Sequence, residues 1–186
     1  MKVIAFFLAL LAMFIFGACR PSAAPISVGN QAVSINDVPQ PGVPSKPVEQ
    51  MSWTQFDGRK HKLQDLRGKA VILDFWATYC KPCLEEIPHL KELQAKYGAE
   101  NLQIVGLHVG GEEDEPKVPE FVERLKIDYQ LGDPEPALTS YIFGRQTAIP
   151  QTAVFDRKGQ LVKKIIGFND EIRAELDAAV VQAMNN

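Results

Sequence analysis

Residues 71–84 read VILDFWATYCKPCL, and this stretch carries the most informative pattern in the sequence. The apolar run from Ala70 to Trp76 is rich in β-branched and aromatic residues, and its length suits a buried strand. A short turn then leads to the Cys-Lys-Pro-Cys segment at residues 80–83, where a helical pattern begins. The stretch therefore predicts a buried strand that runs directly into a helix, with two cysteines at the junction.

The predicted position of Cys80 favours a reactive thiol. The N–H groups of a first helical turn have no intrahelical partners, and the helix dipole adds partial positive charge there. A thiolate at this place is stabilised, so the pKa of the thiol falls. Pro82 suits the first turn because its missing N–H costs nothing there. We therefore expect a redox-active pair, with Cys80 as the nucleophile and Cys83 as the resolving cysteine.

Half a zinc site and a purely structural disulfide are the other uses of such a pair. The chain has only three cysteines, so four cysteine ligands from one chain are excluded. A bridge across two residues closes a very small loop and stabilises little. We therefore expect no resident metal and no cofactor other than the redox-active Cys80–Cys83 disulfide.

The stretch Asp74-Phe-Trp-Ala77, followed by the CxPC segment, resembles the thioredoxin active site. Together with the residues after it, it resembles the extracytoplasmic TlpA/ResA-like branch, which includes the cytochrome c maturation thioredoxins. The resemblance covers roughly Ser52 to the C-terminus. It implies an α/β thioredoxin fold, in which a central mixed β-sheet is flanked by helices, with an N-terminal β-hairpin and an insertion in the core. It also implies a thiol:disulfide oxidoreductase.

Turn residues and apolar periodicity predict the other elements of the domain. They are a hairpin over residues 51–63 that turns at Asp57-Gly58, a helix from Cys80 to about Tyr97, a strand over 101–109, a helix over 118–125, a strand over 127–131, a helix over 136–143, a strand after Pro150, a returning strand over 160–167, and a last helix from Asn169 or Asp170 through Met184.

Two acids are predicted to act on the cysteines. Asp74 matches the buried acid of thioredoxin, so the resemblance implies proton transfer to and from Cys83, although many TlpA-like proteins have Asn there. Burial raises the pKa of such a carboxyl, while an acid merely satisfied by hydrogen bonds is the alternative. Glu86 lies three residues after Cys83, on the same helix face, where the family often has an acid. Glu86 either tunes the thiol pKa or only complements the helix dipole.

A proline that opens a strand is a plausible cis site, although a trans-proline strand cap is the alternative. The thioredoxin resemblance implies that Pro150 is cis and faces the cysteines, where its ring blocks metal capture. The backbone of Ile149 would then bind an extended substrate, and Trp76 and Tyr79 complete the expected substrate-binding set. Gln151 departs from the family, which usually has Thr after this proline.

The N-terminus reads as an export sequence. Residues 1–18 have a short positive start and an apolar run, Val3–Phe16, that is short for a membrane span but right for a signal peptide. The following FGAC resembles a lipobox, which implies that Cys19 is lipidated and anchors the protein to a membrane. A retained membrane anchor and cleavage after Ala24 remain alternatives. Each places the domain outside the cytoplasm, where disulfides persist.

Residues 19–50 form the predicted tether, and residues 51–186 form the thioredoxin-like domain. The tether is rich in Pro, Ser, Asn and Gln without a hydrophobic period, which is typical of an extended linker, although a short strand at 31–35 is an alternative. The acidic loop 110–115 is predicted to be solvated, with a docking surface as the alternative. His89 and His108 are expected to be core or surface residues rather than ligands. The net charge of −3 and the absence of a basic stripe argue against nucleic-acid partners.

The combined prediction is a membrane-anchored lipoprotein of the bacterial envelope that reduces disulfides of envelope proteins through Cys80 and Cys83. The resemblance implies apocytochrome c among the substrates and a membrane thiol transporter as electron donor. A thiol peroxidase is one alternative, but its PxxxTxxC signature is absent, because Thr78 stands two residues before Cys80 and no proline precedes it. A copper-binding assembly factor of the SCO type is another, but such proteins use CxxxC and a distant His.

Overall fold

The computed structural model describes residues 46–186. The predicted signal peptide, Cys19 and most of the predicted tether lie outside the described residues. Within residues 46–186, no helix has the length and apolar character needed to cross a membrane.

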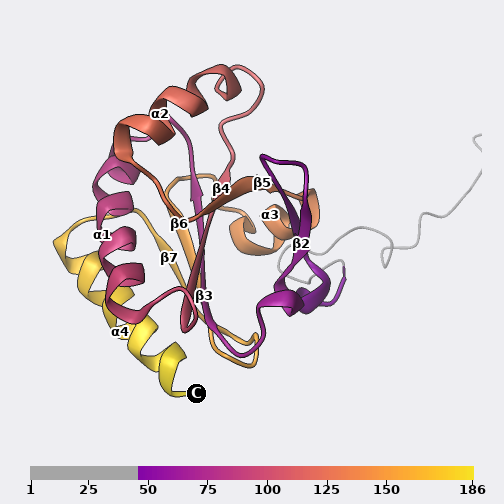
Figure 1. The fold of residues 1–186 in the computed structure, drawn as a ribbon, viewed down its shortest axis with the longest axis vertical. Helices are drawn as coiled ribbons and strands as arrows, with labels where there is room; N and C mark the ends of the chain where they lie inside the picture. Colours follow the sequence, from indigo (N-terminus) through magenta and orange to yellow (C-terminus); the bar gives the residue numbers. More distant parts are fainter. Residues whose placement is uncertain (1–45) are drawn as a thin grey trace, which may run out of the picture. The chain divides into compact units, whose positions relative to one another are not determined.

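A seven-stranded mixed sheet forms the centre of the described chain, in the order β2-β1-β5-β4-β3-β6-β7 (Figure 1). Strands β3, β4 and β5 are parallel, whereas the outer pairs are antiparallel. The strands are β1 Ser52–Gln55, β2 Lys60–Lys62, β3 Ala70–Trp76, β4 Leu102–His108, β5 Gln130–Pro134, β6 Gln151–Phe155 and β7 Leu161–Ile166.

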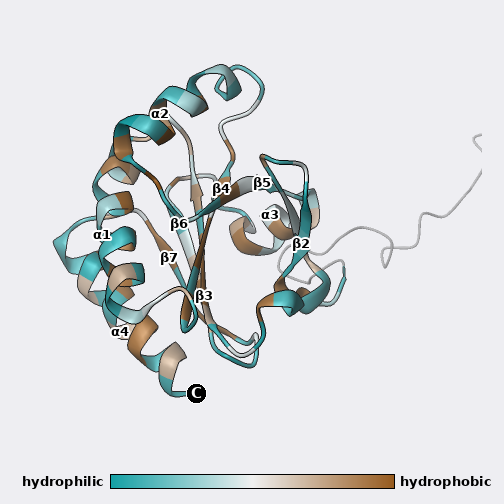
Figure 2. Cartoon of the chain, viewed as in Figure 1, coloured by the Kyte–Doolittle hydropathy of each residue, from teal (hydrophilic) through white to brown (hydrophobic). Residues whose placement is uncertain are grey.

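Within residues 46–186, four α-helices and three short 3-10 helices precede, connect or follow the strands. The α-helices are α1 Lys81–Tyr97, α2 Val118–Leu125, α3 Pro136–Phe143 and α4 Asp170–Asn185, and the 3-10 helices are η2 Val48–Gln50, η3 Leu63–Leu66 and η4 Glu115–Lys117. In Figure 2 the central strands carry mostly hydrophobic residues, whereas the helices combine hydrophobic and hydrophilic ones. The arrangement is the α/β thioredoxin fold that the sequence predicts, with the hairpin β1–β2 ahead of it and β5 and α3 inserted between β4 and β6.

Strand β3 is buried on both faces, which explains its unbroken apolar sequence. Ala70, Ile72 and Trp76 belong to one hydrophobic cluster, with side chains of α1, α2 and α4. The residues between them, Val71, Leu73 and Phe75, belong to a second cluster with η3, α3 and the N-terminal strand. Because side chains alternate along a strand, Asp74 lies on the same face as Ile72 and Trp76, beneath α1.

Two expected boundaries differ from the structure. The inserted strand is Gln130–Pro134, three residues later than predicted, because Lys126 adopts a left-handed conformation (φ 49°) and ends α2 with a turn. Gly132 allows β5 to approach β1, since a Cβ there would lie 2.3 Å from the carbonyl oxygen of Thr54. Residues 46–50, assigned to the tether, include η2, in which Val48 packs against the core.

Candidate active site

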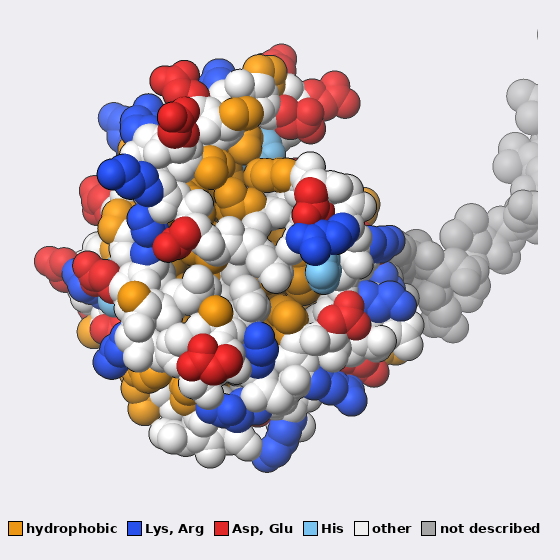
Figure 3. Space-filling model, in the orientation of Figure 1, with side chains coloured by type: hydrophobic (Ala, Val, Ile, Leu, Met, Phe, Trp, Pro, Cys, Tyr) orange, Lys and Arg blue, Asp and Glu red, His pale blue; other side chains and the backbone are white. Residues whose placement is uncertain are grey.

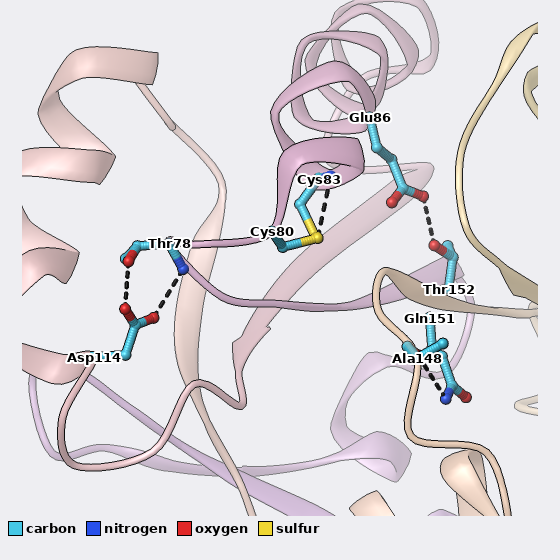
Figure 4. The surroundings of a disulfide bond; sticks show 8 residues. All are labelled: Thr78, Cys80, Cys83, Glu86, Asp114, Ala148, Gln151 and Thr152. Carbon is cyan, nitrogen blue, oxygen red and sulfur yellow. Dashed lines mark hydrogen bonds between the residues drawn. A yellow bond between two sulfur atoms is a disulfide. The ribbon is translucent and has the colours of Figure 1, made fainter.

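Cys80 and Cys83 are joined by a disulfide at the start of α1, with their Cα atoms 5.3 Å apart. Cys80 is the N-cap of α1, and its Sγ accepts a hydrogen bond from the N–H of Cys83 at 3.3 Å (Figure 4). Cys83 is completely buried, whereas Cys80 retains 5% of its surface. The first sulfur therefore lies among the free N–H groups of the helix start, and the second lies one turn deeper in the core.

The residues around the disulfide differ in how a substrate could reach them. Tyr79 is 63% exposed directly before Cys80, whereas Trp76 is fully buried and stacks on Phe121 with ring centroids 4.9 Å apart. The structure therefore does not place Trp76 on a surface that a substrate can contact. Its ring packs in the core beneath the cysteines, since β3 has no solvent-facing side.

The peptide bond between Ile149 and Pro150 is cis, and β6 begins directly after it. Gln151, the residue that departs from the family, turns its side-chain amide back onto the preceding loop. The amide nitrogen donates to the carbonyl oxygens of Gln146 and Ala148 at 3.1 and 3.0 Å. Gln151 thus holds the backbone that leads into Pro150, and Figure 4 shows its hydrogen bond to Ala148.

Asp74 of β3 and Glu86 of α1 form a buried acid pair, with Glu86 three residues after Cys83 on the same helix. Asp74 lies opposite Thr152 in the register of β3 and β6, and the hydroxyl of Thr152 donates to Oε1 of Glu86 at 2.5 Å. Both acids have no exposed surface. Neither oxygen of Asp74 has a hydrogen-bond partner among residues 46–186, nor has Oε2 of Glu86.

The pKa values of both acids follow from this environment. Burial, followed by the charge of Glu86, raises the pKa of Asp74 well above its usual value. Burial raises the pKa of Glu86 to about 7, with the hydrogen bond from Thr152 acting in the opposite direction. Carboxyls that hold a proton near neutral pH can exchange it with a thiol.

Other polar groups lie beside Asp74 without a protein partner. Gly106 is opposite Asp74 in the register of β3 and β4, and a Cβ there would lie 3.0 Å from both Trp76 Nε1 and the ring of Tyr129. Within the described chain, that indole N–H and the Tyr129 hydroxyl are buried without a hydrogen-bond partner. Burial, with the charges of Asp74 and Glu86 adding to it, raises the pKa of Tyr129 well above its usual value, so the phenol stays protonated.

A further buried carboxyl, missed by the sequence analysis, lies on the other side of the disulfide from Glu86 (Figure 4). Asp114 belongs to the acidic loop that was expected to be solvated, yet it is only 1% exposed. Its Oδ2 accepts from the backbone N–H of Thr78 at 2.8 Å, and Oδ1 accepts from the Thr78 hydroxyl. Nε2 of His108 lies 3.0 Å from Oδ2. Nothing in the sequence separates Asp114 from its exposed neighbours Glu112 and Glu113.

Burial alone would raise the pKa of Asp114, but its hydrogen bonds reverse the effect. The two bonds from Thr78 and the interaction with His108 lower the pKa to about 2. The carboxylate is therefore ionised at neutral pH, in contrast to the acid pair beneath α1.

An apolar hollow lies at the end of β4. Two cavities of about 440 and 460 Å³ share His108, Glu115 and Asp133 as lining residues. Phe56 and Val122 contribute apolar walls to one of them. Figure 3 shows hydrophobic atoms in this hollow, between α2 and the β1–β2 hairpin. Across residues 46–186, no group of three or more His, Cys, Asp or Glu side chains could hold a metal ion.

The sheet order and the disulfide at the start of α1 define a thioredoxin-fold protein with a CxxC pair. The profile of the AhpC/TSA family matches residues 44–164. A thiol-disulfide oxidoreductase ResA of Bacillus cereus is 36% identical over 116 residues, which cover 61% of this chain and 64% of that protein. ResA of Geobacillus thermodenitrificans is 34% identical over 131 residues, 67% of this chain and 71% of the relative.

A solved structure supports the same assignment. The thiol:disulfide interchange protein of the thioredoxin family from Chlorobium tepidum TLS has a TM-score of 0.61 and 28% identity, over 76% of this chain and 99% of that one. The chain therefore belongs to the AhpC/TSA family and, within it, to the TlpA/ResA-like thioredoxins. The match spans less than two thirds of the length of the Bacillus cereus relative.

Proposed function

We propose that this protein is a thiol:disulfide oxidoreductase that reduces disulfides of other proteins with the Cys80–Cys83 pair. The observation that carries the proposal is the disulfide itself, with the sulfur of Cys80 at the start of α1 and bonded to the N–H of Cys83. A thiolate in this place is stabilised by the helix start.

The reaction begins from the reduced pair. The thiolate of Cys80 attacks one sulfur of a substrate disulfide, and the other substrate sulfur leaves as a thiolate and takes up a proton. Cys83 then loses its proton and attacks the sulfur of Cys80, which releases the second substrate thiol. Two electrons have passed to the substrate, and the enzyme is left with the disulfide seen in the structure.

The resolving step needs a base near Cys83, because this thiol is buried and starts protonated. Asp74 and Glu86 are buried acids on the strand beneath Cys83 and on its own helix, and burial raises the pKa of both. A raised pKa brings a carboxyl closer to that of a thiol, which favours proton exchange between them. Asp74 takes the proton when it is in its ionised form, and Glu86 tunes the pKa of Asp74 and of the cysteine pair.

The proposal includes a place in the cell. The lipobox-like FGAC supports lipidation of Cys19, which would anchor the domain outside the cytoplasm of a bacterium, where substrate disulfides persist. The names of the ResA relatives support disulfide exchange. By resemblance to the cytochrome c maturation thioredoxins, apocytochrome c is the proposed substrate class, with other envelope disulfides, and a membrane thiol transporter re-reduces the pair.

Covalent trapping tests the proposal. The Cys83→Ala variant, expressed in the native host, should accumulate mixed disulfides between Cys80 and its substrates, because the resolving step is lost. Capture of an apocytochrome would select cytochrome maturation, and capture of many envelope proteins would select general reduction. The Cys80→Ser,Cys83→Ala double variant is the matched control and should trap nothing. An equal set of proteins on the control would contradict the proposal.

A further inference from the structure

The short turn that carries the nucleophile is held by one side chain from a distant loop. Residues 77–79 connect β3 to Cys80, and the N–H of Cys80 bonds back to the carbonyl oxygen of Ala77 at 3.1 Å. Across residues 46–186, Asp114 is the only residue whose side chain forms hydrogen bonds to residues 77–79. Its carboxylate accepts hydrogen bonds from both the backbone N–H and the hydroxyl of Thr78, which lies 36 residues earlier in the sequence.

The surroundings of Asp114 keep its carboxylate charged and in place. His108, at the end of β4, contacts Oδ2 at 3.0 Å, and Lys117 of η4 lies 3.5 Å from Oδ1. Asp133 of β5 faces His108 from the other side, 3.7 Å from Nδ1. A Cβ on Gly110 would lie 2.3 Å from Oδ2, so the loop can bring Asp114 to Thr78 only with glycine at this position.

We infer that Asp114 is a positioning residue for the disulfide-exchange reaction, an inference that rests on the proposed function. By fixing Thr78, it sets the path of the turn, the exposed ring of Tyr79 and the sulfur of Cys80 relative to an incoming disulfide. The carboxylate is almost completely buried, its hydrogen bonds within residues 46–186 go to Thr78 and His108, and it acts on the nucleophile through Thr78.

Paired substitutions separate positioning from charge. In Asp114→Ala the turn loses its anchor, and the rate constant for attack of reduced protein on insulin disulfides should fall about tenfold or more. Asn is the conservative replacement at this position. Its oxygen can accept the N–H of Thr78 and its amide can donate to the Thr78 hydroxyl, so Asp114→Asn should stay within about threefold of wild type. Glu113→Gln, which removes an exposed charge from the same loop, is the matched control and should be unchanged.

Substitutions of Thr78, the residue that Asp114 binds, test the same inference. They also keep it testable if an Asp114 variant fails to fold. Thr78→Ala removes one of the two hydrogen bonds to Asp114 and should slow the attack, though less than Asp114→Ala, whereas Thr78→Ser, which keeps the hydroxyl, should restore it. Thermal unfolding of each variant confirms that the compared proteins are folded. Wild-type rates in both alanine variants would overturn the inference, as would conservative variants that are as slow as the alanine ones. Inactive wild-type protein would instead contradict the proposed function.

Discussion

Two buried carboxyl environments lie on opposite sides of the disulfide, and they have opposite effects on ionisation (Figure 4). On the side of Thr78, Asp114 receives two hydrogen bonds from Thr78 and contacts His108, and its pKa falls to about 2. On the other side, Glu86 receives one hydrogen bond and Asp74 receives none among the described residues. The pKa of both rises, to about 7 for Glu86.

The difference shows that burial alone does not decide the charge of an acid. Desolvation disfavours every buried carboxylate, and hydrogen-bond donors or positive charges near its oxygens can reverse that cost. Asp114 has these donors, so it stays charged and serves as a fixed anchor. Asp74 has no such donor among the described residues and Glu86 has only one, so burial raises the pKa of both and suits them to proton exchange with Cys83.

The largest expected effect concerns Asp74, on the side of the disulfide where burial raises the pKa of the acids. Asp74→Asn removes the carboxyl that exchanges a proton with Cys83, so release of substrate from the mixed disulfide should slow by about a hundredfold or more, the usual range for general acid–base catalysis. The first attack by Cys80 should slow much less. Rapid-mixing measurements of the two phases with a chromophoric disulfide can separate them.

The matched control for this variant is Asp128→Asn, which removes an exposed carboxylate directly before Tyr129. It should leave both phases unchanged. Equal slowing of attack and release by Asp74→Asn would remove Asp74 from the role of base.

An intermediate effect is expected on stability towards neutral pH. The pKa of Glu86 is about 7 in the folded protein and 4.5 when exposed, so the folded state binds the proton more tightly. Its contribution to stability is full below about pH 4.5 and is lost as the pH rises to 7, in total about 3 kcal/mol. Glu86→Gln keeps a neutral side chain at all pH values and should remove most of this loss. Urea unfolding at pH 5 and pH 8 measures the change in the free energy of unfolding for wild type and for Glu86→Gln. The same pH dependence in both proteins would contradict a raised pKa of Glu86.

The smallest effect has the opposite sign and belongs to Asp114. Its pKa of about 2 lies below the usual 3.8, so its contribution to stability is present above about pH 4 and is lost as the pH falls through 2. The loss amounts to about 2 kcal/mol. Asp114→Asn should therefore be less sensitive to acid than wild type in urea unfolding at pH 4.5 and pH 2.5. If acid lowered the free energy of unfolding equally in the two proteins, the hydrogen bonds of Asp114 would not lower its pKa.

Local sequence patterns predicted correctly the elements whose conformation depends on interactions between residues close together in the chain. The apolar run of β3, the start of α1 at Cys80 and the ranges of α2 and α3 were all read from periodicity and turn residues. The inserted strand was misplaced because it begins only after the left-handed turn at Lys126, and its pairing with β1 depends on the close approach that Gly132 permits. Trp76 was assigned to substrate binding, but its place against Phe121 depends on packing with α2.

The amino-acid sequence alone predicts the reactive element of this protein, a strand and a short turn that lead to two cysteines at a helix start. Strand, turn and first helical turn are consecutive in the chain, so their geometry follows from local preferences. Only the tertiary structure decided which buried acids are charged. The donors that control them come from far along the chain, with Thr78 36 residues from Asp114 and Thr152 66 residues from Glu86. The pKa of a buried acid depends on groups brought to it in space, and no spacing rule along the chain specifies them.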